Sequence, residues 1–293
     1  MSQLSVTRRF ATLAQRLGLR AGDTHEIAER TRALSLLFAQ PEASAAGIGW
    51  QSGPPLFRLI DLPRGALSGP VQEDKARAHA TLTCLVEWQQ ESLPALDIRR
   101  IDGLCSRSPL GSSGLPDLEA LAASEACRKL RIISYKDFTR VLGTAVPGFE
   151  RNERLHLRQA SWHGERLFRI NENHPGEFSS AVVYARRRGL EICLPVTVRR
   201  YRLNPAALTD LDRRYHMLAM PSQAWSDPAF MELLLDTGLP YARLGLFNTE
   251  TPESLLLPKD HPQAHAFGLG LRAVGASDLV SYLRACESNA RSS

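Results

Sequence analysis

Residues that could bind an anion gather in one segment, INENHPGEFSSAVVYARRRGLEICLPVTVRRYRLN, residues 170–204. Asn173, His174 and Gly176 belong to a loop before a predicted helix, and Glu177 stands in the first turn of that helix. Unpaired backbone amides at a helix start favour an anion, and a glycine lets a ligand come close. The same residue types are common in turns and helix caps. The loop is therefore either a ligand-binding loop or scaffold, and both interpretations stay open.

Arginines dominate the charge around this loop. Between Arg151 and Arg202 there are eleven arginines, no lysine and five glutamates, so this stretch carries +6 and the rest of the chain carries −1. Such a local concentration is typical of a surface that binds polyanions. Arg186, Arg199, Arg200 and Arg202 are the residues expected to supply charge to a ligand. Charge runs also occur on solvated ends of helices and strands.

Motifs for catalysis and metal binding are incomplete. No G-x-x-x-x-G-K-[ST] or G-x-G-x-x-G loop is present, which disfavours the nucleotide-binding folds built on them. His261 and His265 have a metal-ligand spacing, but no H-E-x-x-H motif surrounds them, so we interpret them as surface histidines. The four tryptophans are scattered and form no aromatic series suited to stacking bases. The sequence therefore predicts no cofactor and no metal site, and it assigns no catalytic residue.

The composition is that of a soluble globular protein. The chain has 293 residues, of which 43% are hydrophobic and 23% charged, enough for one large domain or two smaller ones. No apolar run is long enough to cross a bilayer, and no short apolar stretch typical of a secretion signal follows the first charges. The cysteines are odd in number and widely spaced, which predicts free thiols and a cytoplasmic protein: Cys84, Cys105, Cys127, Cys193 and Cys286. The oligomeric state is not indicated.

Helices and strands alternate, with a hairpin among them, so we predict an α+β fold or an α/β fold with a mixed sheet and flanking helices. Helices are expected over residues 5–18, 23–39 (together a helical hairpin), 72–92, 117–130 and 136–143, after Gly176 up to Gly189, and from residues 205, 228, 262 and 277. Strands are expected at 55–63, 96–104, 130–135, 155–162, 166–171, 193–203, 216–220, 241–247 and 254–258, with a bulge at Arg199 and Arg200. The stretch CSRSPLGSSGLPD is rich in glycine and serine and marks an expected boundary. An N-terminal region, 1–115, would pack on a mixed-sheet body, 116–293.

The order of elements over residues 165–203 resembles the core of ParB-like and sulfiredoxin-like domains. The resemblance lies in a strand, a polar loop with glycine, a helix with a central alanine, G-L, and a strand of P-V-x-V type. It implies a loop that binds nucleotide phosphates and, in some members, binding or cutting of DNA. Alignment on Phe178 and Ala181 puts Gly176 and Glu177 where the family has His and Arg, and His174 lies two positions early. Because arginine fits phosphate and glutamate repels it, binding is favoured over catalysis.

The sequence thus predicts a non-catalytic binding protein whose basic segment 151–202 engages phosphate-rich ligands, either nucleic acid or nucleotide. The alternative is an interaction or regulatory protein that presents the same basic face to an acidic protein. Polyanion binding would weaken steeply with salt, whereas a specific protein partner implies little DNA binding. We also expect loop 171–177 to lie at the open end of a sheet, its amides facing Arg199, Arg200 or Arg202.

Overall fold

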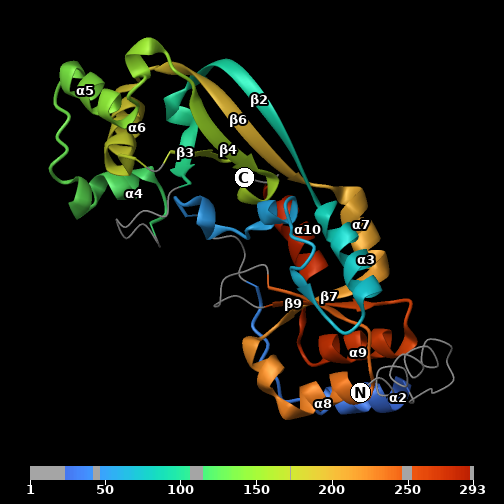
Figure 1. The fold of residues 1–293 in the computed structure, drawn as a ribbon. Helices are drawn as coiled ribbons and strands as arrows, with labels where there is room; N and C mark the ends of the chain where they lie inside the picture. The colour runs from blue at the N-terminus through green and yellow to red at the C-terminus, as the bar shows by residue number, and fades with distance from the viewer. Residues whose placement is uncertain (1–23, 42–46, 106–114, 172, 246–252, 291–293) are drawn as a thin grey trace, which may run out of the picture. The chain divides into compact units, whose positions relative to one another are not determined.

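A computed structural model describes residues 24–41, 47–105, 115–171, 173–245 and 253–290 (Figure 1). Over these residues the fold is α+β, with helices and two five-stranded sheets. Helix 5–18 and most of the glycine- and serine-rich boundary stretch lie outside the described residues. No described helix is both long and apolar enough to cross a membrane.

The chain forms two compact units, each containing one sheet. Unit 1 comprises residues 1–41, 56–85 and 204–284, and unit 2 comprises 42–55, 86–203 and 285–293. A cut at residue 115 does not coincide with this division. The strands β2 (Val86–Asp97) and β3 (Ile101–Leu104) precede that residue, yet they pair with strands that follow it.

The sheet of unit 2 is mixed and has the order β2-β6-β4-β5-β3. The strands β4 (Leu155–Ala160) and β5 (Leu167–Arg169) pair antiparallel, which confirms the predicted hairpin. β6 (Cys193–Leu203) pairs parallel with β4 and antiparallel with β2. β5 and β6 therefore flank β4 and run in opposite directions, so α6 between them is not a crossover between parallel strands.

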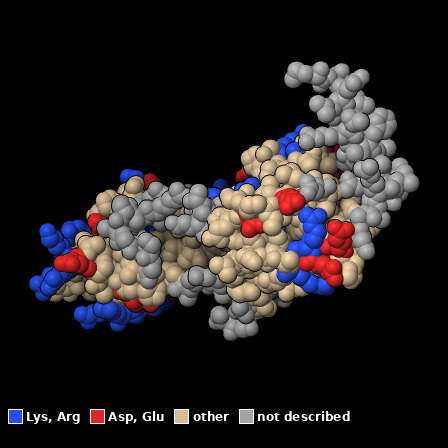
Figure 2. Space-filling view, turned by 90° about the horizontal axis from the view of Figure 1, so that it is seen from below, with Lys and Arg blue, Asp and Glu red and all other residues tan. Residues whose placement is uncertain are grey.

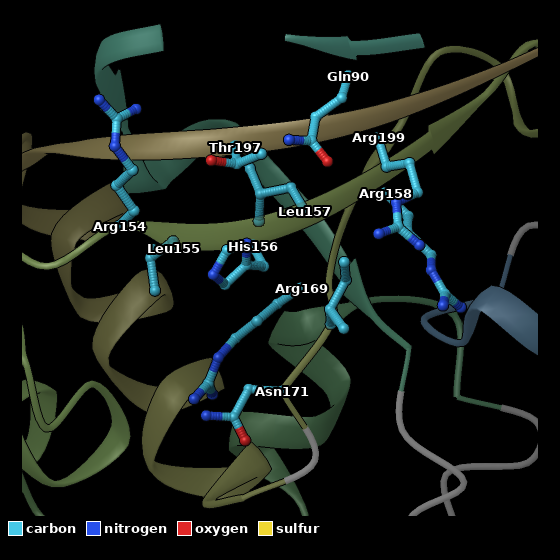
Figure 3. Close-up of a pocket in the computed structure, with 11 residues that line it drawn as sticks. Gln90, Arg154, Leu155, His156, Leu157, Arg158, Arg169, Asn171, Thr197 and Arg199 are labelled. Atoms are coloured by element: carbon cyan, nitrogen blue, oxygen red, sulfur yellow. The ribbon is translucent and has the colours of Figure 1, made fainter. Parts of the chain in front are cut away.

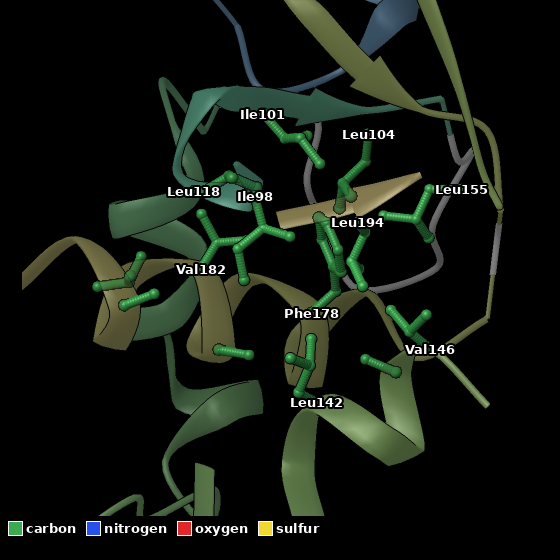
Figure 4. Packing of buried hydrophobic residues seen from close by; sticks show 14 of the residues in the cluster. Ile98, Ile101, Leu104, Leu118, Leu142, Val146, Leu155, Phe178, Val182 and Leu194 are labelled. Atoms are coloured by element: carbon green, nitrogen blue, oxygen red, sulfur yellow. The ribbon is translucent and has the colours of Figure 1, made fainter. Parts of the chain in front are cut away.

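Three helices cover one face of this sheet: α4 (Leu118–Ala123), α5 (Tyr135–Ala145) and α6 (Pro175–Arg188). α6 forms where the apolar spacing predicts it, with Pro175 at its start and Gly189, at φ 64°, ending it in a left-handed conformation. Its apolar face packs on the inward side chains of β4 and β6, such as Leu157 and Val196. Figure 4 shows this core, with Phe178 and Val182 of α6 among its labelled residues.

The other face of the same sheet carries an aromatic cluster. Trp50 lies in the short 3-10 helix η1 (Trp50–Ser52), and its ring centroid is 4.8 Å from His163, 5.4 Å from Phe168 and 5.9 Å from Tyr201. All four side chains are buried. The cluster covers part of this face, and no helix of the α4–α6 group packs there.

Unit 1 has an antiparallel sheet of order β1-β8-β9-β7-β10. Its strands are β1 (Leu67–Ser68), β7 (Tyr215–Met220), β8 (Ala242–Leu244), β9 (Glu253–Pro258) and β10 (Ser277–Asp278). Its helices are α2 (Thr24–Arg32), α3 (Gln72–Thr83), α7 (Pro205–Arg214), α8 (Pro228–Asp236) and α9 (Pro262–Ala273), and α10 (Leu279–Ala290) begins in it. α2, α8 and α9 enclose the core of the unit with β7 and β9.

Several local predictions are wrong. The predicted helix 72–92 ends at Thr83, because residues from Val86 onward pair with β6 instead. Residues 130–135 are not a strand, and 55–63 contain only the 3-10 turn η2 (Leu56–Leu59). Helix 117–130 stops at Ala123 and is followed by the turn η4 (Glu125–Cys127).

The predicted bulge at Arg199 and Arg200 is also wrong. β6 pairs in unbroken register there, and the irregularity lies on β2 between Leu93 and Leu96. Pro94 stands in that interval and cannot donate a ladder hydrogen bond, which explains the position of the irregularity. The correction matters because Arg199 and Arg200 must then point to opposite faces of the sheet.

Candidate anion-binding cavity

A cavity of about 400 Å³ lies against the sheet of unit 2 (Figure 3). Polar side chains of three adjacent strands line it: Gln90 of β2, His156 and Arg158 of β4, and Thr197 and Arg199 of β6. Gln90 and Arg158 both stand opposite Arg199 in the strand registers, and His156 stands opposite Thr197. Because paired residues point to the same side, these five share the face that α4–α6 do not cover.

The two ends of the cavity are both basic. Figure 3 shows Arg158 and Arg199 at one end, on neighbouring strands, and Arg154 at the other. Arg154 directly precedes β4 and its side chain is exposed. The remaining lining residues are Leu155, Leu157, Arg169, Ile170 and Asn171.

No acidic side chain is among the residues that line this cavity. Within the described parts of the chain, Arg154 and Arg199 have no carboxylate oxygen within the 4.0 Å that defines an ion pair. The guanidinium of Arg199 lies 5.4 Å from the ring centroid of Trp88, and that of Arg158 lies 5.9 Å from the ring of Trp50. Both guanidinium groups thus lie within the range of a cation–π contact with a tryptophan ring.

The other predicted arginines are occupied elsewhere. Arg200 forms a 2.9 Å ion pair with Glu91, on the opposite face of the sheet from Arg199. Arg186 donates to the carbonyl oxygens of Arg99 and Ile101, at 2.9 and 2.8 Å, and forms a 2.7 Å ion pair with Glu119. Arg186 therefore connects the C-terminal end of α6 to the backbone of residues 99–101, at the start of β3.

Arg202 is exposed and stands opposite Glu87 in the register of β2 and β6. Like Arg200, it points away from the cavity face because strand residues alternate. Of the four arginines predicted as ligand-binding, Arg199 alone lines the cavity.

Arg169 is a buried cation that the sequence analysis did not single out. Its side chain is only 1% exposed, and the β4–β5 register places it on the helix-covered side with Leu157. One nitrogen, Nη2, donates to the carbonyl oxygen of Ala145 at 2.5 Å, and the guanidinium lies 4.4 Å from the ring centroid of Phe178. Nε and Nη1 have no hydrogen-bond partner among the described residues.

Burial lowers the pKa of Arg169 to about 10, so it stays charged at neutral pH. It therefore adds positive potential from beneath the strands that line the cavity. The sequence could have indicated this burial, because Arg169 is two residues after the core residue Leu167 in the same strand and so points to the same face. A charged residue at a core-facing position is unusual and marks a site worth testing.

The predicted loop is mostly scaffold. Asn171 lines the cavity, but its Oδ1 accepts a 2.8 Å hydrogen bond from the backbone amide of Asn173. His174 starts α6 in a left-handed conformation, with φ 53°, and its Nδ1 lies 3.5 Å from Oε1 of Glu177. Gly176 is a packing glycine, since a β-carbon there would stand 2.9 Å from Sγ of Cys127.

Asn173, His174, Gly176 and Glu177 do not line the cavity. Glu177, in the first turn of α6, interacts favourably with the amides and dipole at the helix start. Of the predicted basic surface, Arg199 is the residue that shares a cavity with this loop, through Asn171.

His261 and His265 are half-buried and hydrogen-bonded, so their interpretation as simple surface histidines is wrong. Nδ1 of His261 accepts a hydrogen bond from the amide of Ala264 at the start of α9. Nδ1 of His265 lies 2.9 Å from Nε2 of His216, which is buried. No cluster of three or more metal-ligating side chains occurs among the described residues.

A second cavity, of about 480 Å³, lies in unit 1 and has a mixed lining. Arg77 and Lys259 line it, but so do Asp74 and Asp260, and Arg77 lies 3.6 Å from Asp260. Arg213 and Arg214 also line it, and both form ion pairs with Asp210, while Lys259 pairs with Asp212. The basic residues of this cavity thus each have a carboxylate partner. The cavity of unit 2 differs because its lining carries basic residues and no acidic one.

Comparisons with known proteins add a family and no function. No curated protein and no solved structure matches the chain. The resemblance of residues 165–203 to ParB-like and sulfiredoxin-like domains therefore stays a prediction. Residues 91–292 match a protein family, and this match includes most of unit 2 and extends through the C-terminal part of unit 1. Since the match covers more than half of the sequence, the chain belongs to the family described as "Family of unknown function (DUF6685)".

Proposed function

We propose that this protein is a non-catalytic binding protein that takes a phosphate-bearing ligand, a nucleotide or nucleic acid, in the cavity of unit 2. The observation that supports this function most strongly is the lining itself: four arginines and no carboxylate among the described residues. Arginine fits phosphate because its planar fork donates two parallel hydrogen bonds to two oxygens.

The arrangement of donors suits a phosphate. Arg158 and Arg199 stand on adjacent strands, about 4.8 Å apart at the backbone, so both forks can reach one phosphate or two neighbouring ones. The hydroxyl of Thr197, the amide of Gln90 and the ring of His156 offer further hydrogen bonds on the same face. Buried Arg169 strengthens the attraction because its charge acts through a medium of low dielectric constant.

Binding without chemistry fits this lining better than catalysis. General acid or base catalysis by a carboxylate needs an Asp or Glu in reach of the ligand, and none lines the cavity among the described residues. The described lining holds neither Ser nor Cys. Its Thr197 hydroxyl and His156 ring stand opposite each other in the β4–β6 register, but no hydrogen bond between these two described side chains activates the hydroxyl as a nucleophile.

A second candidate is binding of an acidic protein. In the face shown in Figure 2, Lys and Arg gather at the left end, where Figure 1 places α5 and α6. The exposed basic residues of this region are Arg128, Lys129, Arg131, Lys136, Arg140, Arg187 and Arg188. This patch, which we call the helix patch, could attract a polyanion or an acidic surface without any cavity.

A cytoplasmic location is also part of the proposal. All five cysteines are free, including the exposed Cys84 and Cys193. Exposed free thiols are typical of proteins in a reducing compartment.

A charge-matched pair of variants separates the two candidates. Arg199→Gln and Arg202→Gln remove the same charge from exposed positions of the same strand, but only Arg199 faces the cavity. With tripolyphosphate as the probe in calorimetric titrations, Arg199→Gln should weaken binding about tenfold or more, because it removes a charge-assisted hydrogen bond. Arg202→Gln should bind as the wild type does.

Two results would contradict the cavity as the binding site. If both variants weaken binding equally, the probe responds to net charge and not to the cavity. If Arg187→Gln with Arg188→Gln weakens binding and Arg199→Gln does not, the helix patch binds the anion.

A further inference from the structure

An exposed tryptophan adjoins the cavity. Trp88 on β2 is 50% exposed, whereas Trp50 and Trp162, also in unit 2, are 2% exposed. In the β2–β6 register Trp88 stands opposite Tyr201, and Gln90 stands opposite Arg199. Trp88 therefore lies on the same face as the cavity, one pleat beyond Gln90, which lines it.

The contact between Trp88 and Arg199 joins an aromatic surface to a phosphate-binding group. The guanidinium carbon lies 5.4 Å from the ring centroid, within the range of a cation–π interaction. Such a contact orients the arginine without neutralising it. Half of the tryptophan surface stays accessible, and every nucleobase has a face that can stack on it.

The spacing of these groups suits a chain of nucleotides. Trp88 lies about 7 Å from Gln90 along β2, and Arg154 lies about 13 Å from Arg158 along β4, at the rise of an extended strand. The distance from Trp88 to Arg154 along the strand direction is therefore about 20 Å, which is longer than a single nucleotide. A base can stack on a side chain only when it is not already stacked and paired in a duplex, which selects single strands.

We propose that the ligand of the unit 2 cavity is single-stranded nucleic acid, with one base stacked on Trp88 and successive phosphates bound by Arg199, Arg158 and Arg154. This inference rests on the proposed function of the cavity and adds the class of ligand. It explains why an arginine-lined cavity adjoins a large exposed ring on an edge strand, where the residues next to the ring, Glu87 and Gln89, are polar.

The test compares bases with phosphates. The probes are a short oligothymidylate, an abasic oligonucleotide of equal length, a duplex and tripolyphosphate, each titrated against the full chain. Trp88→Ala should weaken oligothymidylate binding about 5- to 100-fold, since stacking contributes that much per base. Because Trp88 also orients Arg199, the same variant should weaken binding of the abasic oligonucleotide and of tripolyphosphate, but by clearly less than it weakens binding of oligothymidylate. Trp88→Phe should restore most of the loss.

A matched control removes another exposed ring. Tyr135 on α5 is 58% exposed and does not line the cavity, so Tyr135→Ala should leave all four affinities unchanged. In the wild type, oligothymidylate should quench tryptophan fluorescence, and tripolyphosphate should quench it less.

The results that would contradict single-strand binding differ from those that would contradict the proposed function. If Trp88→Ala affects oligothymidylate and the abasic oligonucleotide equally, or if the duplex binds as tightly as the single strand, the inference is wrong. Binding of tripolyphosphate with unchanged sensitivity to Arg199→Gln would then leave the proposed function intact. If the wild type binds none of the four probes, the inference and the proposed function fail together.

Discussion

Replacing Arg169 with methionine tests whether its buried guanidinium has an acidic partner. Burial lowers its pKa to about 10, which corresponds to a cost of about 3 kcal/mol for the charged form. The hydrogen bond to Ala145 and the contact with Phe178 offset about 2–4 kcal/mol of that cost. Methionine removes the charge and keeps an apolar stem against the ring. We expect Arg169→Met to change the free energy of unfolding by less than about 1.5 kcal/mol.

The assay should report on unit 2 alone. Trp225 is the one tryptophan in unit 1, so a Trp225→Phe background restricts intrinsic fluorescence to unit 2. Urea unfolding at neutral pH then gives the difference in stability between this background and the same protein carrying Arg169→Met. The control is Arg186→Met, which breaks an ion pair and leaves two carbonyl oxygens without their donor. It should cost about 3 kcal/mol or more.

A large loss in Arg169→Met would refute the reasoning. Removing one partner of a buried ion pair typically costs about 3–5 kcal/mol, because the other charge is left unpaired. A loss of that size would show that a carboxylate neutralises Arg169, and the cavity would then lack the additional positive potential assigned to it.

Three further predictions concern packing, pH and thiol reactivity. Gly103→Ala should destabilise unit 2 by at least about 3 kcal/mol in the same urea assay, because the added β-carbon would overlap the backbone carbonyl oxygen of Ile48. The control, Gly143→Ala, places its β-carbon in open space on α5 and should stabilise the unit by about 0.5–1 kcal/mol. Burial lowers the pKa of His163 to about 4, so the unfolded state takes up a proton first and stability should fall as pH decreases from about 6.5 towards 4. His163→Phe should flatten that dependence, and an unchanged slope would contradict it. Desolvation and Glu191 raise the pKa of Cys193, so Glu191→Gln should speed its alkylation, measured by peptide mass spectrometry.

Local signals explain why α6 was predictable. The apolar spacing, the proline at its first position and Gly189 at its end all act within the segment itself. The hairpin of β4 and β5 was predictable for the same reason, since its strands are separated by a few residues around His163 and Gly164. The partners of β2 have no such local signal, because Trp88 pairs with a residue more than a hundred positions away.

The difference between local signals and long-range strand pairing also explains which cavity residues could be predicted. Arg199 was predicted from its position after the loop and helix, but Arg154 and Arg158 join it only through the parallel pairing of β4 with β6. Arg200 and Arg202 were grouped with Arg199 because of the local concentration of arginines, and a bulge was expected at Arg199 and Arg200. With unbroken register, the two-residue alternation of a strand places them on the other face.

The most direct test of the central claim locates a bound anion. Tungstate is a tetrahedral dianion like phosphate, and its anomalous scattering would identify it in crystals of the full chain. We expect a peak in the unit 2 cavity, within hydrogen-bonding distance of the guanidinium groups of Arg158 and Arg199. Peaks confined to the helix patch, with none in the cavity, would contradict the claim that this cavity is the phosphate site.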